Sequence, residues 1–418
     1  MATGDYIGFL DHDDLLSEDA LYEVVNTINS KTNLDNNQSD VDFIYTDEDK
    51  IDENRERFEP YFKPDFSPET LECNNYITHF VVVKKELLDK VGLLNSKFNG
   101  AQDFDFVLRA TENAQKIEHI SKILYHWRVH KSSTANVANS KPYAYEAGIK
   151  VVQEHLKRTN KKGKVEYGQD VPGIYKIKFD IIGKPKVSIL IPNKDNIKLL
   201  KNCIDSIVNL TTYENYEINI IENNSIQKET FEYYKKIVQN SKVKILNYNE
   251  NTILDINGTT QLKNIENVAI DNENKEIKKE SIETNKINEI INQEHLKKDF
   301  NYSALINFGV KNVDCDFILQ LNNDTKVLTK DWLELFIGYA QNKEIGAVGA
   351  RLYYEDKSIQ HAGIAIGLSG IAGNLLVNLP FGKHGYFSRE SATRNVSAVT
   401  GACLFSRKSI YEEVRIYG

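Results

Sequence analysis

Four polar residues near the N-terminus, Asp11-His12-Asp13-Asp14, directly follow an apolar run at positions 6–10. Carboxylates gathered on a tight turn at the end of a strand suit Mg²⁺ or Mn²⁺, because these ions take a few protein oxygens and complete their coordination with substrate phosphate. An acidic surface turn that caps the next helix is the competing interpretation. The apolar run that leads into the turn, and a related turn further along the chain, favour a metal site.

The related turn, Asn322-Asn323-Asp324, follows the apolar positions 317–321. Downstream of each turn the resemblance continues, since residues 80–91 and residues 403–414 both read as a strand, a basic pair and a helix. Two matching blocks in the same order predict two copies of one α/β domain.

Two further segments carry candidate side chains. Asp103 and Asp105 stand at the start of an expected helix. An acid there is often only a cap or a dipole partner, and as a general base Asp103 would have to reach an acceptor hydroxyl. His126 and His130 have the i, i+4 spacing of zinc ligands on a helix. The Tyr, Trp and Val around them favour a strand and loop instead, with His126 or Arg128 near a diphosphate.

The elements expected around the second turn form an alternating pattern. Residues 185–192 read as a buried parallel strand, residues 199–210 as an amphipathic helix, and residues 216–221 and 242–246 as further strands. This is the pattern of an α/β, doubly wound, Rossmann-like nucleotide-binding fold. Residues 251–298 interrupt it with a polar, Asn- and Lys-rich insertion.

Composition limits the class of protein. The 418 residues suffice for two or three domains, and the formal net charge of -8 argues against a nucleic-acid binder. The four cysteines show no CxxC spacing, which favours reduced thiols in a cytoplasmic setting. The uncharged stretch at 362–382 is interrupted by Gly, Asn and Pro, so we expect a buried, loop-rich segment rather than a membrane helix.

Taken in order, these motifs resemble family 2 glycosyltransferases with the GT-A fold, and in particular the bacterial members that build surface polysaccharides, including rhamnosyltransferase-like proteins. In the first copy the resemblance extends from the acidic turn through Tyr-Thr-Asp-Glu-Asp (45–49), Phe-Lys-Pro-Asp-Phe (62–66), Asn-Tyr-Ile-Thr-His (75–79), Ala-Gln-Asp-Phe-Asp (101–105) and Tyr-His-Trp-Arg (125–128). In the second copy it rests on residues 187–195, 221–225, 301–303, 321–324, 360–363 and 400–403.

The resemblance implies transfer of a sugar from a nucleotide-diphosphate donor to a saccharide or lipid-linked glycan, usually with inversion and with Mg²⁺ or Mn²⁺. In the first copy it assigns Asp11 and Asp13 to the ribose and the metal, and Asp103 to the general base. His126 and Arg128 are its further substrate contacts. In the second copy the equivalent assignments are Asp195, Glu222 and Asn224 around base and ribose, with Asp324 as the metal carboxylate. There Asn322 replaces the first acid of the triplet.

The resemblance also predicts how the chain is divided. Residues 1–158 match the C-terminal part of one GT-A domain, residues 159–184 a linker, and residues 185–418 the N-terminal part of a second GT-A domain. On this interpretation each copy is incomplete: the first lacks the nucleoside-binding strands and the second lacks the segment with its base. We therefore expect a piece of a longer tandem transferase or a split reading frame, with little turnover by itself.

Two alternatives stay open at this point. One is a non-catalytic fragment that binds a sugar nucleotide or a glycan. The other is a nucleotidyltransferase, although no GxGxxG or GxxxxGK phosphate loop follows Ile191. The resemblance predicts a cytoplasmic location, with room for peripheral attachment to the inner face of the plasma membrane, and no nucleic-acid partner.

Overall fold

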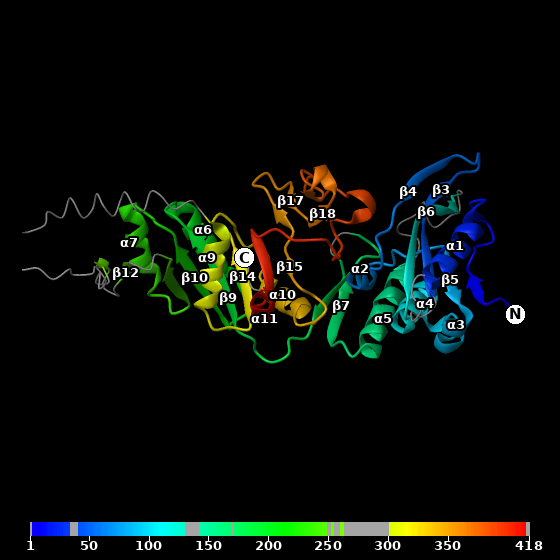
Figure 1. Cartoon of the computed structure of the whole chain (residues 1–418), viewed down its shortest axis with the longest axis horizontal. Coiled ribbons are helices and arrows are strands. Elements are labelled where there is room, and N and C mark those ends of the chain that lie inside the picture. The colour runs from blue at the N-terminus through cyan, green and yellow to red at the C-terminus, as the bar shows by residue number, and fades with distance from the viewer. Residues whose placement is uncertain are drawn as a thin grey trace, which may run out of the picture. The chain divides into compact units, whose positions relative to one another are not determined.

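The computed structural model describes residues 2–33, 41–129, 142–168, 171–248, 252–254, 260–262 and 301–414. Contacts divide the chain into two compact units (Figure 1). Unit 1 consists of Met1–Asp180 and Leu352–Ser397, and unit 2 of Ile181–Arg351 and Ala398–Gly418. A segment that the sequence places in the second copy therefore belongs to unit 1.

Unit 1 contains a mixed sheet with the strand order β1-β5-β3-β6-β2, and β4 pairs with β3 outside that path. Only β3 and β6 run parallel; the other neighbouring strands are antiparallel. The strands are β1 (Tyr6–Gly8), β2 (Leu15–Leu16), β3 (Phe43–Ile51), β4 (Arg57–Tyr61), β5 (Val81–Lys84) and β6 (Ile117–Arg128).

Alternate residues of the central strands supply two apolar cores, one on each face of the sheet. Phe43 and Tyr45 belong to a core formed with α2, α4 and α5, whereas Ile44 belongs to a smaller core formed with α1. The helices are α1 (Ala20–Asn33), α2 (Pro68–Cys73), α3 (Lys85–Val91), α4 (Gln102–Asn113) and α5 (Pro142–Arg158).

The predicted linker at 159–184 includes a hairpin of β7 (Gly163–Tyr167) and β8 (Tyr175–Phe179). Its residues Val165, Tyr175 and Ile177 are part of the larger core of unit 1. These residues therefore contribute to the packing of unit 1 in addition to connecting the two predicted domains.

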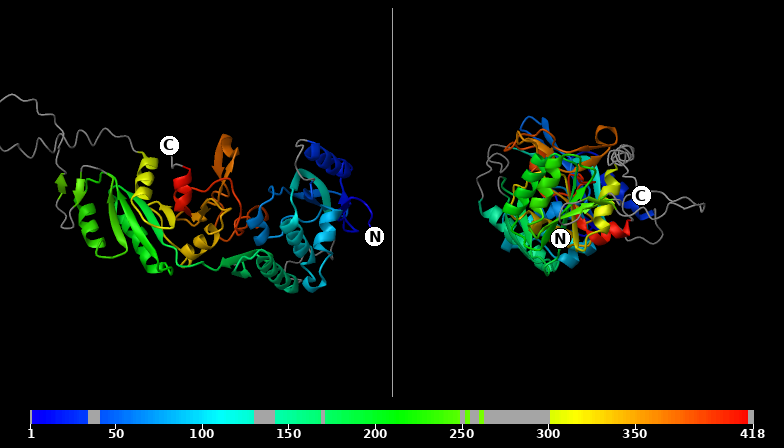
Figure 2. Two further views of the ribbon diagram at one scale, coloured as in Figure 1. Left: turned by 60° about the horizontal axis from the view of Figure 1, so that its bottom comes forward. Right: turned by 90° about the vertical axis from the view of Figure 1, so that its left-hand side faces the viewer.

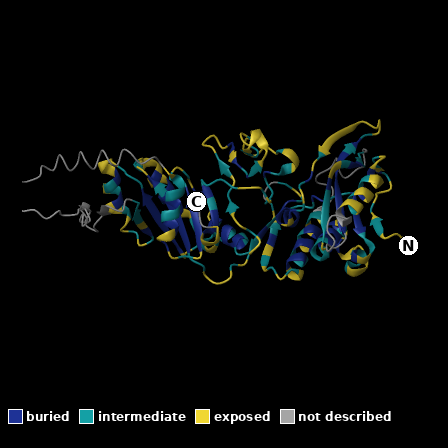
Figure 3. Ribbon diagram, in the orientation of Figure 1, coloured by how far each residue is buried: buried dark blue, intermediate teal, exposed yellow. Residues whose placement is uncertain are grey.

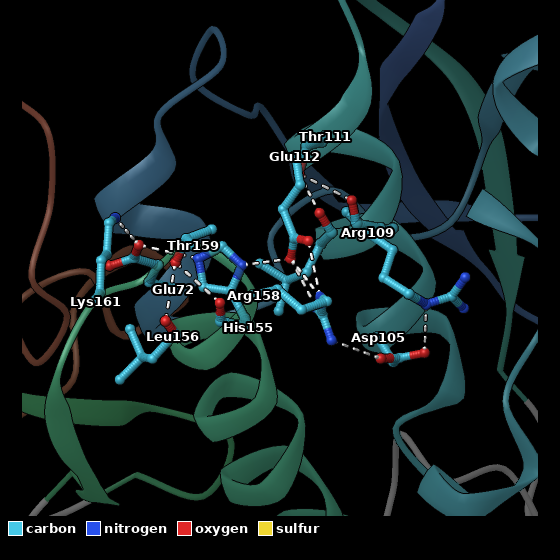
Figure 4. A network of polar contacts seen from close by, with 12 residues as sticks. Glu72, Asp105, Arg109, Thr111, Glu112, His155, Leu156, Arg158, Thr159 and Lys161 are labelled. Carbon is cyan, nitrogen blue, oxygen red and sulfur yellow. Dashed lines mark hydrogen bonds and ion pairs between the residues drawn. The ribbon is translucent and has the colours of Figure 1, made fainter. Parts of the chain in front are cut away.

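A buried polar network joins three helices of that core (Figure 4). His155 of α5 lies between two carboxylates, 2.7 Å from Glu112 of α4 and 3.1 Å from Glu72 of α2. Arg158 donates to Glu112 through two nitrogens, and Lys161 donates to Glu72. The two carboxylates and the hydrogen bonds to them raise the pKa of His155, although burial acts in the opposite direction.

Unit 2 is built on a six-stranded sheet with the order β11-β10-β9-β14-β20-β15. Strands β11, β10, β9 and β14 are parallel, and β20 and β15 continue the sheet antiparallel. The central strands are buried (Figure 3). The strands are β9 (Val187–Asn193), β10 (Tyr216–Glu222), β11 (Val243–Asn247), β14 (Phe317–Leu321), β15 (Val348–Gly349) and β20 (Cys403–Arg407).

Helices cover this second sheet, as the two views of Figure 2 show. Buried residues of α9 (Tyr302–Lys311) pack against Leu190 and Ile221. Gly309 allows this close approach, since a Cβ there would lie 2.5 Å from Ile221 Cδ1. The other helices are α6 (Ile197–Leu210), α7 (Lys228–Ile237), α10 (Trp332–Ala340) and α11 (Lys408–Glu413). The helix and strands predicted between 185 and 246 are confirmed within a few residues.

The remaining elements are short. In unit 2, β12 (Thr252–Leu254) pairs with β13 (Thr260–Leu262). The rest of the predicted insertion at 251–298 lies outside the described residues. In unit 1, β16 (Leu352–Tyr353) pairs with β17 (Ile359–His361), and β18 (Ile364–Ile366) pairs with β19 (Ala372–Asn374).

The uncharged stretch at 362–382 is loop-rich as predicted, but it is not buried. Ile366 is 76% exposed, Ile371 87% and Phe381 64%. The apolar composition of this stretch led to the wrong prediction of a buried segment. A short hairpin has too few residues to cover its own apolar side chains. Within the described residues, the structure contains no helix with the length and apolar character needed to span a bilayer.

The two sheets share one pairing pattern. In unit 1, β1 pairs with β5 so that Tyr6 faces Lys84, and in unit 2, β14 pairs with β20 so that Phe317 faces Arg407. The sequence alignment of the two blocks makes the same residues equivalent. The backbone N–H that follows each partner strand donates in the same way: Lys85 to the carbonyl of Asp5, and Lys408 to the carbonyl of Asp316.

Candidate functional site

The acidic turn after β1 is held by the end of β6. Asp14 is buried and accepts hydrogen bonds from the Tyr125 hydroxyl and from the backbone N–H of Arg128, the latter at 2.7 Å. Arg128 also donates through Nε to the carbonyl of Asp13, at 2.6 Å. Asp11 is exposed and Asp13 is partly exposed. The turn therefore fixes its third carboxylate, Asp14, and leaves its first two nearer to solvent.

Burial raises the pKa of Asp14, because the carboxylate loses water, although the hydrogen bonds from Tyr125 and Arg128 partly offset this effect. Sequence analysis assigned Asp14 no separate role, yet it is the acid that attaches the turn to the sheet.

Asp103 lies in the first turn of α4, as predicted, and its carboxylate is reached by solvent. Asn75 donates to it through Nδ2 at 3.2 Å. Surrounding protein atoms withdraw the carboxyl partly from water and raise its pKa, and the negative charge of Asp11 adds to that rise, whereas His79 opposes it. Asp103 is therefore within electrostatic reach of the acidic turn, and its affinity for a proton is increased.

A buried group of three charged side chains lies beside the turn. Glu48 of β3 accepts from Lys63 Nζ at 2.9 Å and contacts His79 Nδ1 at 3.1 Å. The ring of His79 stacks on that of Tyr125, with 5.5 Å between centroids. Burial acts to raise the pKa of Glu48, but Lys63 and His79 outweigh it and lower that pKa. The group therefore connects the middle of the sheet to the residue that holds Asp14.

His126 and Arg128 are both anchored within unit 1. His126 Nδ1 lies 2.6 Å from Asp49 Oδ1, and Arg57 Nε donates to the other oxygen of Asp49 at 2.6 Å. The predicted strand around His126 is confirmed as β6, and the alternative zinc partner His130 lies outside the described residues. Within the part of the chain that the structure describes, no three His, Cys, Asp or Glu side chains group as a metal site.

In unit 2 the ends of three parallel strands are joined by a chain of hydrogen bonds. Asn323, in the turn after β14, donates to Asn193 at the end of β9. Asn193 donates to the hydroxyl of Tyr234, which donates to Glu222 at the end of β10 over 2.6 Å. Asp324 next to this chain is exposed. The structure thus brings Glu222 and the Asn322-Asn323-Asp324 turn together at the carboxyl edge of the parallel sheet, where α/β folds bind ligands.

The other two predicted residues of unit 2 flank Ser225. Asp195 Oδ1 accepts from the backbone N–H groups of Ile226 and Gln227 and from Thr230 Oγ1, and thereby caps the start of α7. Asn224 adopts a left-handed conformation, with φ of 59°. Burial raises the pKa of Glu222. The carboxylates of Asp195 and Glu222 thus both already accept hydrogen bonds from other groups of the protein.

Comparison with known proteins adds one decisive observation. The model of "Glycosyl transferase family 2" matches residues 1–92, which include the acidic turn, Glu48, Lys63 and His79. Over residues 1–92 the chain is a family 2 glycosyltransferase sequence. The α/β class and the GT-A assignment made from the motifs are confirmed with it.

Two curated relatives match almost all of this chain. Uncharacterized protein y4gI of Sinorhizobium fredii is 36% identical over 417 residues, which is 99% of this chain and 40% of the relative. O-antigen biosynthesis protein RfbC of Myxococcus xanthus is 32% identical over 412 residues, which is 98% of this chain and 28% of that protein. The chain thus spans less than half the length of either relative.

Among solved structures, similarity is remote. The mannosyltransferase PcManGT of Pyrobaculum calidifontis, in complex with GDP-Man and Mn²⁺, aligns with a TM-score of 0.35 at 9% identity, covering 67% of this chain and 58% of that one. GalNAc-T7 with UDP, GalNAc and Mn²⁺ aligns with a TM-score of 0.37 at 13% identity, covering 61% and 40%.

Sequence reasoning on this family 2 chain missed the residues that support the site. Glu48, Lys63 and His79 were quoted as parts of motifs, without a role. Lys63 and His79 carried a signal, because each is a titratable residue next to aromatic residues, and a buried position must satisfy such a group by pairing; Glu48 stood among other acids and carried none. Asn75 carried no such signal, because its contact with Asp103 depends on the fold.

Proposed function

We propose that the acidic turn after β1 and Asp103 together form a glycosyl-transfer site in unit 1. The reaction would move a sugar from a nucleoside-diphosphate donor to a saccharide hydroxyl, with inversion, in the synthesis of a cell-surface polysaccharide. One observation carries this proposal: Asp103 lies in the first turn of α4 with its carboxylate held by Asn75, in a chain whose acidic turn lies within the part that matches this family.

The donor set of the turn suits Mg²⁺ or Mn²⁺. Asp11 and Asp13 present hard carboxylate oxygens near solvent, and such ions need only one or two protein carboxylates when substrate phosphates supply other ligands. When bound, the ion would neutralise charge on the departing diphosphate. Asp14, Tyr125 and Arg128 would keep the two ligand residues in place through the hydrogen bonds described above.

Asp103 would act as the general base. Its carboxylate would accept the proton of the acceptor hydroxyl as that oxygen forms a bond to the anomeric carbon and the diphosphate departs with the bonding electrons. Partial withdrawal from water raises its proton affinity and so favours this role. Asn75 would orient the carboxylate, while His126 and Arg128 complete the polar surroundings of the donor.

For unit 2 we propose a second GT-A copy that binds nucleotide. In this copy Asp195, Glu222 and Asn224 lie around base and ribose, and Asp324 is the metal carboxylate. The shared strand register supports two copies, with the divisions at 1–158, 159–184 and 185–418. A binding role without catalysis is the second candidate for unit 2, because Asn322 stands in its turn where unit 1 has Asp11.

The proposal is tested by Mn²⁺ binding followed by electron paramagnetic resonance, with UDP, GDP or dTDP present. The variants Asp11→Asn and Asp13→Asn should weaken nucleotide-dependent Mn²⁺ binding. Asp5→Asn makes the same charge change at the other, exposed end of β1 and should not. Equal binding by all four proteins would refute the metal site, and transfer from a panel of donors then tests catalysis.

The predicted location of the protein is part of the same proposal. A cytoplasmic enzyme at the inner face of the plasma membrane would meet nucleotide sugars and a lipid-linked acceptor together. Fractionation of cells that produce the chain, with and without a high-salt wash of the membranes, would test it.

A further inference from the structure

In the sequence, residues 386–395 follow the Asn322-Asn323-Asp324 turn of the second copy. In the structure they belong to unit 1 and contact the rest of that unit at two places. We call these residues the clamp. Its first contact is with β4 and with Phe62, which follows β4; its second is with α2. Both contacts lie within unit 1.

The first contact supplies hydrogen-bond partners to an exposed backbone. The Tyr386 hydroxyl donates to the carbonyl of Pro60 at 2.7 Å and accepts from the N–H of Phe62 at 2.8 Å. Arg389 donates to the carbonyl of Phe62. The ring of Phe387 stacks on that of Tyr61, with 3.9 Å between centroids and 19° between planes. The clamp thus engages the backbone on both sides of Tyr61 and covers its side chain.

The second contact fixes the other end of the clamp. Asn395 donates through Nδ2 to Glu69 at 2.7 Å and through its backbone N–H to Thr70 Oγ1 at 3.1 Å. The backbone N–H of Thr393 donates to the Sγ of Cys73, at 3.3 Å. Two separate attachments prevent the segment from pivoting on either one.

The clamp itself is braced against movement. Phe387 and Ser388 both have left-handed φ angles, 48° and 53°, which non-glycine residues adopt only when their surroundings enforce them. Glu390 is buried and accepts from the backbone N–H of Gly385 at 3.0 Å and lies 2.9 Å from His384 Nδ1. This internal bracing supports the strained turn that presents the Phe387 ring.

A chain of contacts continues from the clamp to the proposed site. Strand β4 is an edge strand that pairs only with β3, with Tyr61 opposite Glu48. The Lys63 ammonium lies 5.8 Å from the centre of the Tyr61 ring, and it is the group that pairs with Glu48. Glu48 in turn contacts His79, which stacks on the tyrosine that holds Asp14.

We propose that the clamp is a positioning element for the unit 1 site: by fixing β4 it keeps Tyr61 and Lys63 where they hold Glu48 and His79 beside the acidic turn. A segment of the second copy thereby completes the surroundings of the first. That the acidic turn belongs to an active site rests on the proposed function, whereas the positioning of Tyr61 and Lys63 rests only on the contacts described above.

Trp127 offers a local readout of this positioning. Its ring lies 4.7 Å from that of His79 and 5.5 Å from Lys50 Nζ, and unit 2 contains the other tryptophan of the chain, Trp332. In the full chain with Trp332→Phe, fluorescence therefore comes from Trp127 alone. A change in the contacts of His79 should shift its emission or alter its quenching.

In that background, Phe387→Ala should shift the emission of Trp127 in the folded protein, and Tyr386→Phe should do so to a smaller extent. Phe387→Tyr should retain the original spectrum because the stacked ring remains. Ile371→Ala changes an exposed apolar residue between β18 and β19, outside the clamp, and is the control that should leave the spectrum unchanged. Tyr386→Phe deletes only a hydroxyl, so it keeps the test valid if Phe387→Ala fails to fold.

A purely structural clamp would give another result: Phe387→Ala and Tyr386→Phe would lower the urea midpoint while the native Trp127 spectrum stays unchanged. That outcome overturns the proposal. Mn²⁺ binding in the presence of UDP, measured on the same proteins, separates the two proposals. If the parent protein binds no Mn²⁺ but Phe387→Ala still shifts Trp127, the proposed function fails and the positioning stands.

Discussion

The turns after β1 and β14 occupy equivalent places in two sheets of the same register, yet they are held by different chemistry. In unit 1 a buried acid, Asp14, accepts from Tyr125 and Arg128 of β6. In unit 2 an amide, Asn323, donates to Asn193 and through it reaches Tyr234 and Glu222. The backbone frame therefore determines where the turn lies, and the side chains around it determine which charges it can hold.

The proposed general base, Asp103, gives the strongest test of this comparison between the two units. Asp103→Asn should lower sugar transfer by about 10²- to 10⁴-fold, the usual range for loss of a general base, with little change in nucleotide binding. Asp324→Asn in unit 2 should leave the rate unchanged. Initial rates of transfer by the two variants provide the measurement, and the reverse ranking would place catalysis in unit 2.

Because the two turns are attached differently, removing an acid from each should change the free energy of unfolding by different amounts. Asp14→Ala leaves the buried Tyr125 hydroxyl and an Arg128 N–H without their acceptor, which should cost about 1–3 kcal/mol of unfolding free energy. Asp324→Ala changes an exposed carboxylate and should stay within about 0.5 kcal/mol. Urea unfolding followed by Trp127 for the first and Trp332 for the second would check both values. A cost at Asp324 as large as at Asp14 would contradict the contrast.

The pH dependence of stability should also differ, because the described part of unit 2 contains no histidine. The pKa of His155 is raised in the folded state, so its stabilisation is complete below about pH 6.5 and is lost as the pH rises through the folded value. Glu72 and Glu112 have lowered pKa values, so their contribution is lost as the pH falls below about 4.5.

His155→Gln should therefore flatten the fall in unit 1 stability as the pH rises above about 6.5, measured by urea midpoints with Trp127 as the probe. In unit 2 the pKa of Glu217 is lowered to about 2: burial opposes this shift, but Lys244, Lys186 and Ser188 outweigh it. Its stabilisation should fade only on the acid side. An unchanged alkaline slope in His155→Gln would show that other groups cause the slope.

The smallest expected effect concerns the missing acid in unit 2. Asn322→Asp restores the charge that Asp11 has in unit 1, and it should strengthen Mn²⁺ binding by unit 2 a few-fold, since each added carboxylate favours a hard cation. Titration of Mn²⁺ into this variant in an Asp11→Asn/Asp13→Asn background isolates unit 2. No gain would mean that the turns differ in more than this one charge.

Local patterns in the sequence were enough to predict much of the frame. Val187–Asn193 is an apolar run of strand length beside Pro185, and α6 shows clear helical periodicity, so both were located within a few residues. The acidic turn was found because its carboxylates cluster directly after an apolar run, whereas Asp103 was assigned its role by the family resemblance. That Asp103 and the acidic turn interact could not be predicted, because it depends on how α4 packs against the sheet.

Long-range pairing explains what the sequence did not reveal. Lys63 pairs with Glu48 because β4 folds back on β3, and nothing local marks the two as partners. The bond between Thr70 and Asn395 joins positions 325 apart, which no periodicity can indicate. The exposed side chains at 362–382 were assigned to the interior for the same reason: hydropathy reports what a residue prefers, while the fold decides whether anything covers it.

The shared register has a cost during folding. Strands β1 and β14 offer the same hydrogen-bonding edge, so each partner strand, β5 or β20, could join the wrong sheet while the chain is still assembling. Side chains work against such an exchange. Ser406 of β20 donates to the carbonyl of Gly346 in its own unit, and Val83 at the matching position of β5 has no hydroxyl to do so. Divergence between the copies therefore helps each half of the chain to find its own partner and avoid a misassembled, aggregation-prone product.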